Sequence, residues 1–509
     1  MSNLSSPEHA ISDPARPVFA NHVEVGQCSV VTTLTSKPSR DGHELRIAGD
    51  IEVRADLVHD VDPALLRTRA RATGELSYNL RSVRAGGAFE GDARERARRL
   101  LGALEHYDVI DLEADRDLTP DILARIPPHR RRISWHGTGC DMRTLTAQFE
   151  RMARTPARLY LLAPDIRSAE DALVPLQLLK RLRRSDVTAF GTARAGIWSR
   201  LLAPRLGAPI VYGRLHGNDE FVPTVDQLTS DYRLPALLPL KHLFAIVGRS
   251  AGASMSPKLH NTGYRAIGFP ALYVPMPVDD FGPFWSKVVD GLGELGFSLD
   301  GLTVVSPHKE AALGAGARAS KVATHSGAAN LLVRTRHGWR AHSTNAAGVL
   351  GALRSAGVRL AGQKAAVIGC GGAGRAAAWT LLKSGVRPDV INRGAERGHY
   401  AAQLLGLTYV PLRNFAPENY SLIVHATTLR DEAPFAVEQL SEGTVLLDMG
   451  YGAKETALVA AARARTDRRL VIIDGWAMLS ADAAEQFQKM TGRRMPVRDA
   501  RIVLSSNGN

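Results

Sequence analysis

Cysteine is scarce in this chain, and long apolar runs are lacking. The 509 residues include only three cysteines, Cys28, Cys140 and Cys370, and their spacing fits neither a metal site nor a disulfide framework. We interpret them as buried or incidental thiols in a reducing cytoplasm. No apolar run approaches the roughly 20 residues that a membrane span requires. Residues 1–22 lack the basic start and apolar stretch of a signal peptide, so we expect a disordered tail. These absences favour a cytoplasmic protein without a membrane partner.

Positive charge is in excess, but it is not concentrated. The formal net charge is +13, yet the arginines are scattered, with short runs only at 130–132 and 183–184. No nucleic-acid motif accompanies them, so we expect arginine-rich solvated faces and a small-molecule partner. Apolar residues make up 45% and charged residues 23%, as in ordinary globular proteins. At roughly 100–200 residues per domain, the length predicts two to four domains.

The first half alternates short apolar segments with helical stretches. Eight such segments over residues 23–233 predict a parallel (β/α)8 barrel. The predicted strands begin at Cys28, Ile51, Leu76, Asp108, Arg131, Ala157, Asp186 and Pro209. The proline-bearing segment 234–242 then predicts a linker, and a new βαβ series begins at Leu243.

A glycine-rich turn in the second half predicts a dinucleotide site. The strand Ala365–Ile368 runs into a turn and then a helix. This context lets the backbone approach a pyrophosphate at a helix N-terminus. The expected cofactor-binding residues of the turn are Gly369, Gly371, Gly372, Ala373 and Gly374.

The end of the next strand indicates which dinucleotide binds. Asn392 and Arg393 stand where an NAD enzyme would carry an acidic residue for the ribose hydroxyls. Arginine suits a 2′-phosphate instead, so we predict NADP(H). Thr427 and Met478 are expected to contact the same cofactor.

From Leu243 onward the chain resembles shikimate dehydrogenases. The resemblance rests on five separated motifs: GRSAGASMSPKLHN, GLTVVSPHKE, GAANLLV, DMGYGAKETAL and IIDGWAMLSADAAEQF. It implies a substrate lobe over 243–345 with C-terminal helices from 481–509, and a Rossmann-like NADP lobe over 346–480. It also implies reversible reduction of 3-dehydroshikimate with Lys309 as catalytic lysine. The implied substrate-binding residues are Ser254, Ser256, Asn330 and Tyr451.

The pocket departs from the family pattern at several positions. Asn345 stands where the resemblance places the catalytic aspartate, and an amide cannot accept a proton. Val305 and Leu331 replace threonines, and Asp482 replaces a substrate-binding glutamine. Loss of the aspartate should lower the pKa of Lys309. We therefore expect a related cyclic polyol acid as substrate, such as one with an amine or without one hydroxyl, or else a weakened reductase.

The barrel resembles type I 3-dehydroquinate dehydratase, in a more diverged form. The resemblance implies a pocket at the strand ends, lined by Glu52, Arg54, Arg81, His136 and Arg200. It also implies a Schiff-base lysine on strand six, but ARLYLLAPDI has none, and residues 23–233 contain only Lys37 and Lys180. Arginine stays protonated and cannot form an imine. Ala85 replaces the glutamate expected beside the histidine, and Phe221-Val222 replace a Gly-Gln lid pair.

Together these patterns predict an NADP-dependent shikimate-dehydrogenase-type oxidoreductase fused to an inactive dehydratase barrel. Two alternatives remain open: an active bifunctional enzyme of aromatic amino acid biosynthesis, and a non-catalytic sensor of shikimate-like acids.

Overall fold

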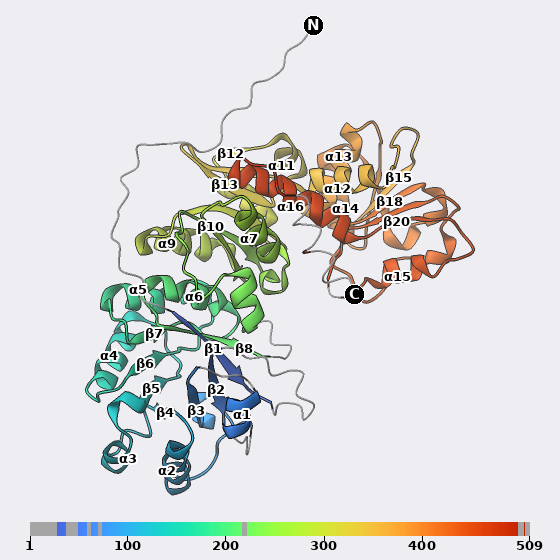
Figure 1. Cartoon of the computed structure of the whole chain (residues 1–509). Coiled ribbons are helices and arrows are strands. Elements are labelled where there is room, and N and C mark those ends of the chain that lie inside the picture. Colours follow the sequence, from blue (N-terminus) through green and yellow to red (C-terminus); the bar gives the residue numbers. More distant parts are fainter. Residues whose placement is uncertain are drawn as a thin grey trace.

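The structure is a computed structural model, and it describes residues 28–36, 49–58, 63–69, 74–215, 221–452, 454–496 and 503. Three sheet-based units follow one another along the chain (Figure 1). The expected tail 1–22 and Lys37 lie outside the described residues. Within these ranges, none of the helices combines the length and apolar character that a membrane crossing demands.

Eight parallel strands form the first unit, and each predicted apolar segment supplies one of them. Strand β1 pairs with both β2 and β8, so the sheet curls back on itself. Within the described residues no ladder joins β7 to β8; Phe190 and Tyr212 face each other there, with ring centroids 6.1 Å apart. The barrel is therefore nearly closed. Its strands are β1 Ser29–Leu34, β2 Asp50–Arg54, β3 Leu76–Asn79, β4 Val109–Glu113, β5 Arg131–Trp135, β6 Leu159–Leu162, β7 Val187–Ala189 and β8 Ile210–Arg214.

Helices cover the outside of the barrel, as apolar faces on the strands require. Side chains of α4 and α5 reach the same buried cluster as β5 and β6. In α2 the side chain of Asp92 accepts a hydrogen bond from the N–H of Glu95 and so caps the first turn. The helices are α1 Pro63–Arg69, α2 Ala93–Gly102, α3 Pro120–Arg125, α4 Met142–Ala153, α5 Leu173–Leu182 and α6 Ile197–Leu202.

The second unit is a mixed sheet with strand order β10-β9-β11-β13-β14-β12. Strands β9, β10 and β11 are parallel, whereas β13 runs antiparallel to β11 and β14. Its strands are β9 His242–Gly248, β10 Ala271–Pro277, β11 Leu299–Val304, β12 Arg318–Ala319, β13 Leu331–Thr335 and β14 Gly338–His342. Its helices include α7 Ser256–Ala266, α9 Val289–Leu295, α10 Lys309–Ala315 and α11 Lys321–Ser326.

The third unit is a parallel sheet in the order β17-β16-β15-β18-β19-β20. The chain order reverses between β15 and β18, which is where doubly wound folds bind their ligands. Its strands are β15 Ala365–Ile368, β16 Asp389–Asn392, β17 Thr408–Pro411, β18 Leu422–His425, β19 Val445–Asp448 and β20 Val471–Ile473. Its helices are α13 Gly372–Lys383, α14 Ala395–Leu405 and α15 Ala457–Arg463.

Two long helices tie the second and third units together. α12 spans Asn345–Ser355 and packs along α16, which spans Gly475–Thr491. Met478, near the start of α16, belongs to the core of the third unit, whereas Phe487, near its end, is buried in the core of the second. Helix α16 therefore crosses from one lobe to the other (Figure 1).

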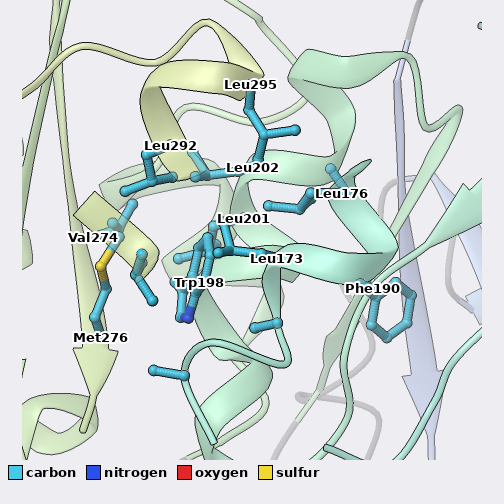
Figure 2. Close-up of a cluster of buried hydrophobic side chains, with 14 of the residues drawn as sticks. Leu173, Leu176, Phe190, Trp198, Leu201, Leu202, Val274, Met276, Leu292 and Leu295 are labelled. Atoms are coloured by element: carbon cyan, nitrogen blue, oxygen red, sulfur yellow. The ribbon is translucent and has the colours of Figure 1, made fainter. Parts of the chain in front are cut away.

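The barrel and the second unit share one hydrophobic core. Trp198 on α6 is fully buried and lies beside Val274 and Met276 of β10 (Figure 2). On the other side of the same interface, Leu173 of α5 contacts the α9 backbone closely: a Cβ built at Gly291 would lie 2.7 Å from its side chain. The barrel is thus packed onto the second unit rather than tethered to it.

Candidate active site

The glycine-rich turn follows β15 and leads directly into α13. Gly369 has φ +104°, and a Cβ built at Gly374 would lie 1.8 Å from its carbonyl oxygen, so the tight turn requires both glycines. A Cβ at Gly371 would meet no atom within 4 Å. No side chain caps α13, whose first turn includes Gly372 and Ala373. This open helix N-terminus fits an anionic pyrophosphate.

The expected contacts around the turn come together at the ends of β16 and β18. The Asn392 side chain accepts a hydrogen bond from the Cys370 N–H at 3.3 Å, and Arg393 beside it is exposed. Thr427 lies across the turn, since a Cβ at Gly369 would approach its methyl group to 2.8 Å. Its hydroxyl is 2.6 Å from Nε2 of His425. Asn392, Arg393 and Thr427 therefore lie around one turn.

Lys309 begins α10 and lies against this turn. A Cβ built at Gly372 would lie 3.3 Å from Lys309 Cβ and 3.5 Å from its Cδ. Burial lowers the pKa of Lys309, and the negative charge of Asp482 partly opposes this. The pKa is lowered because of burial, and the expected effect of the missing aspartate stays a prediction. The stem of a lysine with a lowered pKa thus lies beside the glycine turn.

Arg375, a residue that sequence reasoning missed, joins the turn to the lysine helix. It is 1% exposed and donates hydrogen bonds to the carbonyl oxygens of Ser326 and Cys370 at 2.6 and 3.0 Å. Its Nη2 also contacts Glu310, the neighbour of Lys309, at 2.7 Å. The arginine therefore fixes the third unit against α10 and α11. Its place in the sequence GCGGAGRAAA was the available signal.

Several hydroxyl groups gather near the start of α7. Ser254 precedes α7, and its Oγ accepts a hydrogen bond from the N–H of Ser256 at 3.1 Å. Burial raises the pKa of Tyr451, and the facing Ser254 hydroxyl opposes this rise. Burial likewise raises the pKa of Tyr273, and the hydroxyls of Thr303 and Ser256 oppose that rise. Such hydroxyls suit a carboxylate or a ring hydroxyl of a substrate.

Between these hydroxyls and the lysine lies a buried polar network centred on Asp482. Its Oδ1 accepts a hydrogen bond from the Thr344 hydroxyl at 2.6 Å and its Oδ2 one from Gln486 at 2.7 Å. Asn330 Nδ2 is 3.4 Å from Oδ1. Asn345 begins α12 immediately after Thr344. Thr344 and Gln486 were missed, although Gln486 stands one helical turn after Asp482.

The remaining predicted site residues contact other parts of the second and third units. Val305 is half-buried, and a Cβ at Gly248 would lie 2.5 Å from its methyl group. Leu331 is fully buried within the apolar core of the second unit. The Met478 side chain lies against α12, 2.9 Å from where a Cβ at Gly348 would stand.

The barrel contains a second polar cluster. Arg132, another residue that was missed, forms close ion pairs with Glu52 and Asp111 inside the barrel. Arg54 pairs with Asp56 at 2.7 Å. Glu52 and Arg54 therefore already have charged partners. Arg132 was missed because an ion pair between distant strands is not encoded by any local motif.

Two predicted barrel residues present buried nitrogen atoms without a hydrogen-bond partner among the described residues. Arg81 Nε and His136 Nδ1 are buried and make no hydrogen bond within the described residues. Arg200 lies over the Phe190 ring, 4.3 Å from its centroid. Burial and the surrounding arginines hold the pKa of His136 well below its usual range. A neutral imidazole among guanidinium groups is chemically suited to an anionic ligand.

No amine lies on the interior of strand six. Arg132 and Ser134 of β5 face inward and pair in register with Leu159 and Leu161 of β6, so these leucines also face inward. Lys180 lies on α5, where its Nζ contacts the Glu294 carbonyl oxygen of the second unit. Its position at this interface agrees with the prediction that it does not reach the pocket.

The fold and the residues around the glycine turn define a two-lobed dehydrogenase, with a doubly wound nucleotide lobe and a lysine-bearing substrate lobe. Family comparison agrees. Residues 246–332 match the shikimate dehydrogenase substrate binding domain, and residues 30–238 match type I 3-dehydroquinase. The NADP(+) shikimate dehydrogenase of Acidiphilium cryptum is 34% identical over 266 residues, which cover 51% of this chain and 93% of that protein. The chain belongs to the shikimate dehydrogenase family.

Other relatives match one or both halves. The chloroplastic bifunctional 3-dehydroquinate dehydratase/shikimate dehydrogenase of Arabidopsis thaliana is 25% identical over 500 residues, covering 91% of this chain and 80% of that protein. The shikimate 5-dehydrogenase of Thermus thermophilus, solved with NADP(H) and shikimate, is 28% identical, covers 52% of this chain and 99% of its own, and gives a TM-score of 0.46.

Proposed function

We propose that the chain is an NADP-dependent enzyme that reversibly reduces the ring ketone of 3-dehydroshikimate or a closely related cyclic polyol acid. The position of Lys309 carries this proposal, because its stem lies against Gly372 of the glycine turn, and the charge of Asp482 opposes the lowering of its pKa.

The domain boundaries that we propose are a barrel over 23–233, a linker over 234–242, a substrate lobe over 243–345 with 481–509, and an NADP lobe over 346–480.

NADPH, when bound, supplies the hydride. The free N–H groups at the start of α13 would hold its pyrophosphate, and Arg393 would hold its 2′-phosphate. Ser254, Ser256 and Tyr451 would bind the substrate carboxylate. As the carbonyl carbon is reduced, the Lys309 ammonium gives a proton to the carbonyl oxygen, and the same amine accepts that proton in the reverse direction.

The substrate is tested by following NADPH absorbance with shikimate, quinate, dehydroshikimate and their amino or deoxy analogues. We expect turnover, and better turnover of an analogue than of shikimate, because Val305 and Asp482 change the pocket. Ordinary rates with shikimate would refute the altered substrate. NADP binding without turnover of any ring acid would refute the enzyme and support the sensor.

For the barrel we propose binding of an anionic ring acid without Schiff-base dehydratase activity. The inward-facing side chains of β6 are apolar, and the pocket arginines cannot form an imine. Borohydride treatment with dehydroquinate should leave the mass of the protein unchanged, while a dehydratase that carries the strand-six lysine gains an adduct. An adduct on this chain would overturn the proposal and favour a bifunctional enzyme.

A further inference from the structure

An arginine of the barrel contacts the second unit at the carboxyl ends of two of its strands. Arg194 lies in the segment between β7 and α6, and its side chain is 28% exposed. Its Nη1 donates a hydrogen bond to the carbonyl oxygen of Arg249 at 2.7 Å, and its Nη2 forms a close ion pair with Asp279. Arg249 directly follows β9, and Asp279 comes two residues after β10, the parallel neighbour of β9. One side chain therefore holds the ends of two strands.

The segment that carries Arg194 is itself fixed to the barrel. The N–H and the hydroxyl of Thr192 both donate hydrogen bonds to the carbonyl oxygen of Pro164, at 2.9 and 3.0 Å. Ala193, between Thr192 and Arg194, has φ +59° and ψ −176°, a backbone conformation that a residue with a Cβ rarely adopts. Such a conformation persists only where its surroundings hold it, and here the contacts of both neighbours do so. The guanidinium group is thus presented to the second unit from a fixed backbone.

The two strand ends that the barrel arginine holds are in turn bonded to the turn that leads into α10. The Arg249 N–H donates a hydrogen bond to the carbonyl oxygen of Ser306 at 3.4 Å. The carbonyl oxygen of Val278, next to the paired aspartate, accepts one from Nε2 of His308 at 2.9 Å. His308 directly precedes Lys309, the first residue of α10. A continuous set of hydrogen bonds and peptide links therefore runs from the barrel to the lysine.

We propose that Arg194 is a positioning residue of the reductase: through this side chain the barrel holds the turn 306–308 and the segment 249–254, so that Lys309 and Ser254 keep their places. This inference rests on the proposed reductase function. A guanidinium group suits the task because its planar fork directs two donors at once, here one to a carbonyl oxygen and one to a carboxylate. The barrel thus supports reduction without taking part in its chemistry.

The test uses the full-length chain and three variants: Arg194→Met, Arg194→Lys and Arg151→Met. Arg194→Met removes both donors, so kcat/KM for the ring ketone should fall about three- to tenfold, as expected for the loss of one or two hydrogen bonds. Arg194→Lys keeps a charge for Asp279 and should recover part of that loss. Arg151 pairs with Asp115 within the barrel and is the matched control, so Arg151→Met should leave kcat/KM unchanged.

A second readout does not need turnover. Hydrogen–deuterium exchange, measured by mass spectrometry on peptides that cover 247–256 and 303–312, follows the backbone N–H groups of the two held segments. Exchange in both segments should be faster in Arg194→Met than in the native chain, because the local opening of these segments becomes easier. The free energy of global unfolding should stay the same, since a partly exposed ion pair adds little to it.

Faster exchange in these two segments together with a lower kcat/KM would support the inference. Native exchange in both segments, or an unchanged kcat/KM, would overturn it. A lower free energy of unfolding with faster exchange throughout the chain would also overturn it, because Arg194 would then only dock the barrel. Absence of all ring-acid turnover in the native chain would instead refute the proposed function, while the exchange data would still decide whether Arg194 orders the turn.

Discussion

The reductase site and the barrel interior both contain buried polar side chains, and they differ in one chemical group, the amine. The reductase site contains Lys309, whose stem lies against the glycine turn, and the charge of Asp482 opposes the lowering of its pKa. The barrel pocket has Arg54, Arg81, Arg132 and Arg200 but no amine on the inner face of β6. An arginine binds anions and stays protonated, so it can neither form an imine nor deliver a proton near neutral pH. The comparison teaches that two buried polar sites in one chain can differ in the chemistry that their basic groups allow, an amine in one and guanidinium groups in the other.

The largest expected effect is on the reductase site. Lys309→Met should lower kcat for ring-ketone reduction by about 10²–10⁴-fold, because the proton donor is lost. NADPH affinity, measured by fluorescence titration, should change little, since the glycine turn stays intact. Lys180→Met, at the barrel interface, is the control and should keep full activity. If Lys180→Met lost as much activity as Lys309→Met, the assignment of the two lysines would be wrong.

The second effect concerns the core that the two regions share. Trp198→Ala should lower the free energy of unfolding by about 3–5 kcal/mol, because it leaves a large cavity between α6 and β10. Chemical denaturation measures this loss. Leu238→Ala, at a side chain that is 50% exposed, should change it by about 0.5 kcal/mol or less. Equal effects would mean that the barrel is only tethered to the reductase.

The third effect concerns cofactor choice. Arg393→Ala should weaken NADPH binding roughly tenfold to hundredfold, because a charge-assisted hydrogen bond to the 2′-phosphate is lost. NADH binding should be nearly unchanged. Titration of both cofactors checks the difference, and equal weakening of the two would show that Arg393 does not read the phosphate.

The smallest effect is the pH response of the barrel pocket. His136 stays neutral when folded, whereas in the unfolded chain it gains a proton as the pH falls below about 6.5. The unfolded state then binds more protons, so the free energy of unfolding should decrease as the pH is lowered. This residue contributes up to about 1.4 kcal/mol per pH unit to that decrease. His136→Gln should reduce the slope of unfolding free energy against pH, and the exposed His337→Gln should not.

Local patterns in the sequence predicted the strands and the turn well. Each of the eight barrel segments is a strand, and Ala365–Ile368 forms β15 with the predicted bounds. Alternating apolar residues and a strand-glycine-helix context are local signals, so they can be recognised without knowledge of the tertiary structure. The incomplete pairing between β7 and β8 has no such signal, because it depends on the geometry of closure.

The networks around the predicted residues could not be read in the same way. Asp482 was singled out, but its bond to Thr344 joins residues 138 positions apart. Arg132 reaches Glu52 over 80 positions. Such pairs are created by packing, and a single sequence contains no record of them. That α6 contacts both the barrel and β10 could not be predicted from the sequence for the same reason.

The contrast between the two sites is tested most directly by one coupled assay on the native protein. NADPH consumption is followed with 3-dehydroshikimate and, separately, with 3-dehydroquinate, and the products are identified by mass spectrometry. We expect consumption with dehydroshikimate or its analogue, and no shikimate from dehydroquinate until a separate dehydratase is added. Shikimate formed from dehydroquinate by this chain alone would contradict the account.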